Sequence, residues 1–354
     1  MRATVIGGGV VGLATATELS ERGAEVTLYE RNAELGGNAS WLAGGMLARY
    51  CEGESAPESV VARGAGAIDW WARRAPGVAR QGSLVVAPPR DVSEIERFAA
   101  RTRRWERVDA AAIGELEPDL AGRFRKGLFF VEEGHVDPRV AMEALLLGLK
   151  RRRATLCFGA DVGLEPPRPS ADVVVDCRGW AARAALPELR GVRGEMLLAR
   201  TREISLKRPV RLLHPRFPLY VVPRADGVFM IGATMIESAD KGGVSVRSAI
   251  ELLSAAYALH PAFGEAEILE MCADVRPAFP DNEPRIVERG GRIYVNGAYR
   301  HGFLLAPDLA RRAAEMAARL AEAAPEESKI KALQDKALQD LALAGFPSSG
   351  EWTG

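Results

Sequence analysis

The sequence predicts an α/β protein of two interleaved domains, a Rossmann-like nucleotide-binding domain and a second domain built on an antiparallel sheet. Residues 4–30 form a strand–helix–strand pattern around a glycine-rich turn. Further along, continuous apolar strands of the parallel type alternate with stretches whose patterns suit antiparallel strands. The 354 residues, 47% of them hydrophobic, can bury a core large enough for two domains.

The first unit, TVIGGGVVGLATATELSERGAEVTLYE, carries glycines with the spacing of a dinucleotide-binding turn. Gly7 allows the tight turn, Gly9 lets the backbone approach a pyrophosphate, and Gly12 lets the helix pack close to the strand. The helix N-terminus offers unpaired N–H groups to the phosphates. Glu30 ends the second strand, where a carboxylate accepts hydrogen bonds from the adenosine ribose. Because an acid there disfavours a 2′-phosphate, the unit predicts FAD or NAD rather than NADP.

The remaining pattern supplies the other elements. Residues 34–48 are too rich in glycine for a regular helix and too apolar for a solvated loop, which indicates backbone packed against a flat or charged group. A helix is expected at 57–74 with Trp70 and Trp71 in the core, and a hairpin turn at 225–227. Further strands are expected at 78–88, 127–131, 172–176, 292–296 and in pieces of 192–234. Further helices are expected at 91–107, 140–149 and 306–323, and in the tandem repeat at 331–340, before a turn-rich end at 346–354.

Bulk composition excludes several classes of function. The 47 basic and 47 acidic residues cancel, so no net field attracts nucleic acid or an anionic membrane, and the basic run at 150–153 suits a helix C-terminus. No segment approaches the roughly 20 apolar residues of a membrane helix. The first strand begins close to Met1, so we expect no signal peptide. Four scattered cysteines lack metal-ligand spacing and predict free thiols in a reducing, cytoplasmic environment: Cys51, Cys157, Cys177 and Cys272.

A series of motifs in a fixed order gives the chain a family resemblance. The motifs are IGGGVVGL with Glu30, GGNASWLAGGMLA, GHVDPR at 134–139, YVVPRADGVFMIGATM at 220–235, and VRPAFPDNEP at 275–284 followed by NGAYRHGFLLAP at 296–307. The chain resembles the FAD-dependent D-amino-acid oxidase superfamily, and within it the glycine oxidase branch associated with thiamine biosynthesis. The resemblance runs from the first strand to about residue 323.

The resemblance implies a Rossmann-like FAD-binding domain and a substrate domain whose antiparallel sheet roofs the flavin. The implied division is 1–75, 132–190 and 270–325 for the FAD-binding domain, 76–131 and 191–269 for the substrate domain, and 326–354 for a peripheral helix and tail. The residues it assigns to the cofactor are Gly7, Gly9, Val10, Val11 and Gly12 at the pyrophosphate, Glu30, Arg31 and Val162 at the adenosine end, Ala39, Ser40, Gly44, Gly45 and Met46 toward the isoalloxazine, and Ala298, Tyr299, Arg300, His301, Gly302, Phe303 and Leu304 beside the flavin ring. A helix N-terminus near Ala306 would stabilise a reduced, anionic flavin.

An amino acid that gives its α-hydrogen to a flavin needs a fixed carboxylate, and a planar guanidinium holds a carboxylate at two points. Arg276 and Arg300 fall on the family's two arginine positions, Tyr220 on its carboxylate-binding tyrosine, and Met235 on its pocket wall. The implied reaction is oxidative deamination of glycine or a similar small amino acid or amine, with dioxygen reduced to hydrogen peroxide. Because the lone pair of the neutral amine drives hydride transfer, no catalytic side chain is expected.

Two other functions stay open, and several residues depart from the family pattern. A dehydrogenase of this fold would pass electrons to a quinone or other acceptor, whereas an NAD-dependent dehydrogenase or nucleotide-sensing module would hold no flavin. His301 replaces a common Asn, Ala298 a common His, and Glu195 a usual Gln. Cys272 lies out of register for covalent attachment, so FAD is expected to be non-covalent. The resemblance also leads us to expect a homo-oligomer, either a dimer or a tetramer.

Overall fold

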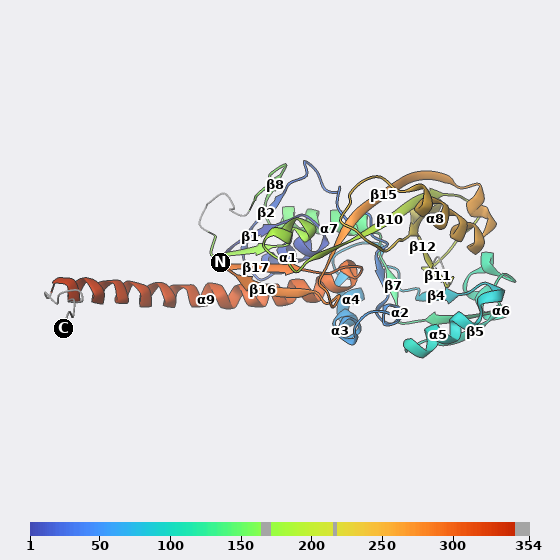
Figure 1. Ribbon diagram of the computed structural model, residues 1–354, viewed down its shortest axis with the longest axis horizontal. Coiled ribbons are helices and arrows are strands. Elements are labelled where there is room, and N and C mark those ends of the chain that lie inside the picture. Colours follow the sequence, from blue (N-terminus) through green and yellow to red (C-terminus); the bar gives the residue numbers. More distant parts are fainter. Residues whose placement is uncertain (164–170, 215–217, 344–354) are drawn as a thin grey trace, which may run out of the picture.

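Two sheets divide the molecule, one on the left and one on the right of its body in Figure 1. The computed structural model describes residues 1–163, 171–214 and 218–343, of which 324–343 by their backbone alone. The chain enters each sheet more than once, which confirms the interleaved α/β fold predicted from the sequence. The predicted turn-rich end at 346–354 lies outside the described residues.

The first sheet has the spatial order β16–β17–β9–β1–β2–β8. Its pairs are parallel except for β16 with β17. Helices cover this sheet, which explains why β9 carries the uninterrupted run VVV. The strands are β1 (Arg2–Ile6), β2 (Glu25–Glu30), β8 (Thr155–Phe158), β9 (Val173–Asp176), β16 (Arg285–Arg289) and β17 (Arg292–Asn296).

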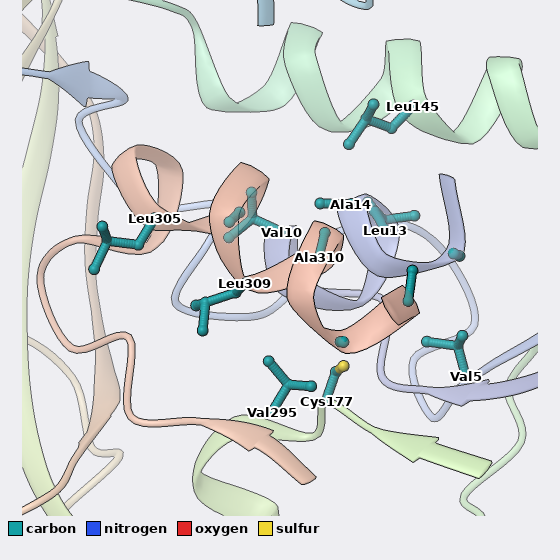
Figure 2. Close-up of a cluster of buried hydrophobic side chains, with 14 of the residues drawn as sticks. Val5, Val10, Leu13, Ala14, Leu145, Cys177, Val295, Leu305, Leu309 and Ala310 are labelled. Carbon is teal, nitrogen blue, oxygen red and sulfur yellow. The ribbon is translucent and has the colours of Figure 1, made fainter. Parts of the chain in front are cut away.

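Small residues bring the covering helices close together. Figure 2 shows Leu13 and Ala14 of α1 beside Ala310 of α9, with Leu145 of α7 on one side and Val295 of β17 on the other. No helix in the described part of the chain is long and apolar enough to cross a membrane. The helices of this half are α1 (Val10–Glu21), α3 (Glu58–Arg63), α4 (Ala67–Ala72), α7 (Pro138–Arg151) and α9 (Gly302–Leu343).

The second sheet has nine strands in the order β14–β10–β13–β12–β11–β4–β6–β5, with β15 paired to β10. Its pairs are antiparallel apart from β11 with β4. The predicted hairpin turn joins β12 to β13, with Asp226 in the left-handed region (φ 58°). The strands are β4 (Ser83–Val86), β5 (Glu106–Asp109), β6 (Lys126–Phe130), β10 (Arg190–Arg200), β11 (Val210–Leu212), β12 (Leu219–Pro223), β13 (Val228–Gly232), β14 (Ile236–Glu237) and β15 (Glu267–Ala278).

Shorter elements complete the described chain. A two-stranded sheet pairs Met46 with His135 and so holds the end of the glycine-rich segment. Its strands are β3 (Met46–Leu47) and β7 (Gly134–His135), and the remaining helices are α2 (Arg49–Glu52), α5 (Ser93–Arg101), α6 (Ala110–Leu116) and α8 (Val246–Leu259). Short 3₁₀-helices are η1 (Gly64–Gly66), η2 (Pro89–Asp91), η3 (Pro118–Leu120), η4 (Gly179–Ala184), η5 (Ala225–Gly227) and η6 (Pro261–Gly264).

Three predicted helices have different bounds in the structure. The helix expected at 57–74 is interrupted by η1, where a Cβ on Gly64 would lie 2.8 Å from Leu304 of α9. The helix expected at 91–107 ends at Arg101, and β5 follows it. The two helices expected at 306–323 and 331–340 are one continuous helix, α9, which projects away from the sheets (Figure 1).

Two boundaries of the proposed domain division fall inside strands of the nine-stranded sheet, one of them after Arg190, the first residue of β10. Strand β15 begins at Glu267 and pairs with β10 along its whole length, so the boundary proposed at residue 270 falls inside a strand of the nine-stranded sheet. This strand was not predicted from the sequence, because apolar and polar residues do not alternate along EILEMCADVRPA and a proline, Pro277, falls within it. Because Arg276 belongs to β15, it reaches the cavity from the antiparallel sheet.

Candidate functional site

A large cavity extends from the glycine turn after β1 to the nine-stranded sheet. It contains about 1790 Å³ of empty space, part of which is open to solvent. Its lining joins the β1–α1 turn, the glycine-rich segment, the start of α9, and residues of β10, β12 and β15.

Two glycines of the turn, Gly7 and Gly12, have no room for a side chain. Gly7 has φ +107°, and a Cβ there would lie 2.7 Å from the carbonyl oxygen of Cys177. A Cβ on Gly12 would lie 1.8 Å from the carbonyl oxygen of Gly7. Gly12 does not line the cavity, so its contribution is the close packing of α1 against the turn. The arrangement leaves the N-terminus of α1 open toward the cavity, as phosphate binding requires.

Polar contacts fix the loop that surrounds this helix start. Ser40 Oγ accepts a hydrogen bond from the N–H of Val10 at 3.1 Å, which ties the glycine-rich segment to α1. Glu30 is 7% exposed, and its two carboxylate oxygens accept from the N–H of Gly8 at 2.5 Å and of Asn32 at 2.9 Å. The carboxylate therefore sits at the cavity wall in a fixed orientation, with lone pairs left for a ribose hydroxyl.

The structure brings the predicted cofactor residues together with one exception, Gly12. The lining includes Gly7, Gly9, Val10, Val11, Glu30, Arg31, Ala39, Ser40, Gly44, Gly45, Met46, Val162, Ala298, Tyr299, Arg300, His301, Gly302, Phe303 and Leu304. Helix α9 starts at Gly302 rather than near Ala306, so its first-turn N–H groups lie in the cavity wall itself.

Arg178 is a lining residue that the sequence did not single out. Its guanidinium pairs with Asp176 at 2.6 Å, and its Nη1 donates to the carbonyl oxygens of Val162 at 3.1 Å and Gly163 at 3.0 Å. Arg178 therefore holds the segment at the predicted adenine end in place. Its position two residues after a buried strand was the available signal, because ligands of such sheets bind at the carboxyl ends of the strands.

Arg276 lies on β15 and its guanidinium lies over Gly194. A Cβ at Gly194 would lie 2.2 Å from the guanidinium carbon, so only glycine leaves space for this side chain. Nη1 donates to the carbonyl oxygen of Thr234 at 2.9 Å, and among the described residues no carboxylate pairs with Arg276. Burial lowers the pKa of the guanidinium, which nevertheless stays charged at every working pH. Tyr220 on β12 also lines the cavity, with its ring against Gly44.

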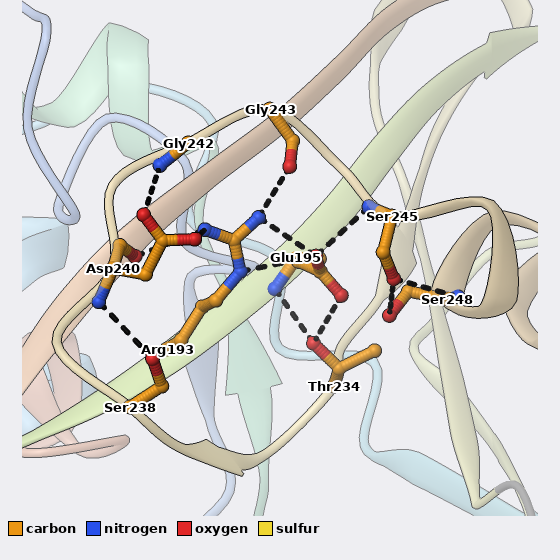
Figure 3. Close-up of polar contacts among 9 residues, drawn as sticks. All are labelled: Arg193, Glu195, Thr234, Ser238, Asp240, Gly242, Gly243, Ser245 and Ser248. Atoms are coloured by element: carbon orange, nitrogen blue, oxygen red, sulfur yellow. Dashed lines mark hydrogen bonds and ion pairs between the residues drawn. The ribbon is translucent and has the colours of Figure 1, made fainter.

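A buried network positions Thr234 (Figure 3). The carbonyl oxygen of Thr234 accepts the hydrogen bond from Arg276. The Glu195 carboxylate accepts from Arg193 Nη2 at 2.8 Å, from the N–H of Ser245 at 3.2 Å, and from Thr234 Oγ1 at 3.2 Å. Thr234 Oγ1 in turn accepts from the N–H of Glu195 at 2.9 Å. Glu195, a departure from the family pattern, is therefore a structural residue whose charge Arg193 neutralises.

Arg300 also lines the cavity, but it is already paired. Its Nη2 lies 3.1 Å from Glu52 Oε2, and the same oxygen lies 3.4 Å from Nδ1 of His301. Burial is the main cause that lowers the pKa of His301, to about 4, so its imidazole is neutral at pH 7. Met235 was predicted to form a wall of the cavity, but it is not among the lining residues. Its side chain is half exposed, and its Sδ contacts Nη1 of Arg300 at 3.2 Å and the hydroxyl of Tyr299 at 3.6 Å.

The fold and this cavity define a dinucleotide-binding protein in which a second, antiparallel sheet forms part of the cavity wall. The chain belongs to the family of FAD dependent oxidoreductases named DAO, whose model matches residues 2–316. It is 56% identical over 311 residues to a protein of Rhizobium etli named as the thiamine biosynthesis oxidoreductase ThiO, covering 88% of this chain and 94% of that one.

Two further comparisons are with glycine oxidases. The glycine oxidase of Pseudomonas putida is 28% identical over 339 residues, covering 86% of this chain and 90% of that protein. The structure of glycine oxidase from Bacillus cereus matches with a TM-score of 0.75 at 23% identity, covering 89% of this chain and 94% of that chain, a likeness of fold. The chain is therefore an FAD-dependent oxidoreductase of the glycine oxidase and ThiO type, which confirms the family and the cofactor predicted from the sequence.

The cavity fits FAD. Glycines replace side chains where the pyrophosphate would lie, Glu30 is fixed where a ribose would lie, and the first turn of α9 borders the opposite end. None of the four cysteines belongs to the described lining, and Cys272 Sγ contacts Glu270 instead. This placement supports non-covalent binding, which remains our proposal.

Proposed function

We propose that the protein catalyses the oxidative deamination of glycine or a similar small amino acid or amine, giving an oxo acid, ammonia and hydrogen peroxide. FAD bound in the cavity supplies the hydride acceptor. The observation that carries the proposal is Arg276, a guanidinium that faces the cavity beside Tyr220 without a carboxylate partner among the described residues. A buried cation in this state favours an anionic ligand strongly.

The chain's own residues bind and orient the substrate in this proposal. Arg276 grips the substrate carboxylate at two points, and the Tyr220 hydroxyl donates a third hydrogen bond. Arg300 borders the same space and adds positive charge, part of which Glu52 neutralises. Because His301 is neutral at pH 7, it adds no further positive charge beside Arg300. The α-carbon is thereby directed toward the cofactor end of the cavity.

The electron acceptor is the point on which a second function differs. A dehydrogenase of the same fold would carry out the same first half-reaction and pass the electrons to a quinone or another acceptor. The relative at 28% identity is named a glycine oxidase, which favours a small amino-acid substrate and dioxygen as the acceptor. We therefore propose dioxygen as the acceptor.

The proposal is tested by anaerobic flavin reduction. The purified protein is mixed without oxygen with glycine, sarcosine, D-alanine and L-alanine, and the visible absorbance of the flavin is followed. Bleaching by glycine or another of the small amines, followed by peroxide formation when air is admitted, is the expected result. An absorbance that no member of the panel changes would refute the substrate class, and bleaching without peroxide would select the dehydrogenase.

A further inference from the structure

Glu52 is a buried carboxylate on the wall of the cavity. It ends α2, and its side chain is 7% exposed. Oε1 accepts from Arg211 Nη2 at 2.5 Å, and Oε2 lies 3.1 Å from Arg300 Nη2. Burial alone would raise the pKa of Glu52, but Arg300 and Arg211 outweigh it and hold the pKa at about 2. The residue is therefore an anion at every pH at which the protein would work.

The two arginines assigned to the substrate are not equivalent. Arg276 makes one hydrogen bond to a backbone carbonyl, and no acidic side chain of the described residues pairs with it. Arg300 has an internal carboxylate partner that the fold holds at 3.1 Å. A ligand carboxylate can occupy Arg276 directly, whereas at Arg300 it would have to displace Glu52 or approach that anion closely.

We propose that Glu52 is a specificity-determining residue: it occupies Arg300 as an internal carboxylate, so the cavity takes small amines with one carboxylate and rejects those with two. The inference rests on the proposed function, because it concerns the substrate class of that same site. Of these two arginines, it assigns Arg276 as the free carboxylate anchor. Glu52 lies outside the motifs of the sequence, in the segment ARYCEGES, and its partner Arg211 comes from β11.

Charge alone supports the direction of this selectivity. The Arg300–Glu52 pair carries no net charge, and His301 beside it is neutral. Without the Glu52 charge, Arg300 would be a guanidinium without its carboxylate partner in the cavity wall. A second ligand carboxylate would then form a charge-assisted pair with Arg300 instead of meeting a like charge.

The test compares Glu52→Gln with the unmodified holoenzyme. Acetate and malonate serve as probes with one and two carboxylates, and their dissociation constants are measured from changes in the flavin absorbance spectrum. We expect malonate affinity relative to acetate affinity to rise at least tenfold in Glu52→Gln. Glu54→Gln is the matched control, because Glu54 pairs with Arg101 outside the cavity and should leave the ratio within twofold. An unchanged ratio in Glu52→Gln would overturn the inference.

A second pair of variants covers the case in which Glu52→Gln does not fold, since it removes the charge partner of buried Arg211. Arg300→Met is expected to weaken acetate binding less than tenfold, and Arg276→Met at least a hundredfold. Equal losses in the two variants would mean that Arg300 is a free anchor, and the inference would be wrong. Failure here is distinct from failure of the proposed function, which depends on whether any small amine bleaches the flavin.

Discussion

Replacement of Glu133 by Gln probes the buried charges beside the cavity. Glu133 follows β6 and is 1% exposed, and its Oε1 accepts from the N–H groups of Tyr50 at 2.9 Å and Cys51 at 2.7 Å at the start of α2. Its Oε2 has no hydrogen-bond partner among the described residues. Burial raises the pKa of this carboxyl from 4.5 to about 7, although the Cys51 N–H opposes the shift.

The size and sign of the effect follow from this pKa. Since the pKa of Glu133 is higher in the folded protein, its contribution to stability is fully present below pH 4.5 and is lost as pH rises through 7. The difference of about 2.5 units at 1.36 kcal/mol each gives a loss of about 3 kcal/mol by pH 8 and about 1 kcal/mol at pH 5. Gln resembles the protonated acid and keeps the acceptor for the two N–H groups. Glu133→Gln should therefore exceed the unmodified protein in unfolding free energy by these amounts.

The assay is urea unfolding of the FAD-loaded protein at pH 5 and pH 8, followed by tryptophan fluorescence. Glu132→Gln is the matched control, because the Glu132 side chain is 47% exposed and should change stability by less than about 0.5 kcal/mol at both pH values. A Glu133→Gln variant whose advantage does not grow between pH 5 and pH 8 would refute the reasoning.

Three other substitutions have expected outcomes. Gly12→Ala places a Cβ 1.8 Å from the Gly7 carbonyl oxygen, so FAD affinity measured by titration should fall at least tenfold, whereas Gly66→Ala, with open space around its Cβ, should not change it. The pKa of His301 is lowered to about 4 in the folded protein, so this residue reduces the free energy of unfolding as pH falls from 7 to 4. His301→Asn removes that effect, and the free energy of unfolding should fall by about 3 kcal/mol less in the variant than in the unmodified protein over this range. Equal losses in the two proteins would contradict this. Arg208→Met leaves the fully buried Glu117 without its 2.8 Å partner and should destabilise the fold by about 3–5 kcal/mol in urea unfolding, and a change below about 1 kcal/mol would be evidence against an effective buried pair.

The sequence predicted the parts of the fold that local patterns encode. The glycine turn, the buried strand β9 and the hairpin at Asp226 all depend on backbone geometry or burial that neighbouring residues specify. Strand β15 was missed because its pairing with β10 is a contact between distant segments. The end of the long C-terminal helix was also wrong, since α9 continues through the repeat at 331–340.

The residues of the candidate site also fall into two groups, those that local motifs predicted and those that the structure revealed. Residues in motifs, such as Arg276 and Tyr220, were predicted because the motif carries them, and the structure places both in the cavity lining. Glu52 was not predicted, because it acts by pairing with arginines that only the fold brings near. Arg178 was missed although its place after a buried strand was a signal. Met235 was assigned by motif alone, and its half-exposed side chain lies outside the lining.

The central claim is that Arg276 binds the substrate carboxylate, and anaerobic titration of Arg276→Met with glycine tests it most directly. We expect the variant to retain FAD and to need at least a hundredfold more glycine for half-maximal flavin reduction, as loss of a two-point charged contact of about 3 kcal/mol predicts. Arg200→Met, an exposed position on β10, should titrate like the unmodified protein. Flavin reduction in Arg276→Met at the glycine concentration that suffices for the unmodified protein would contradict the claim.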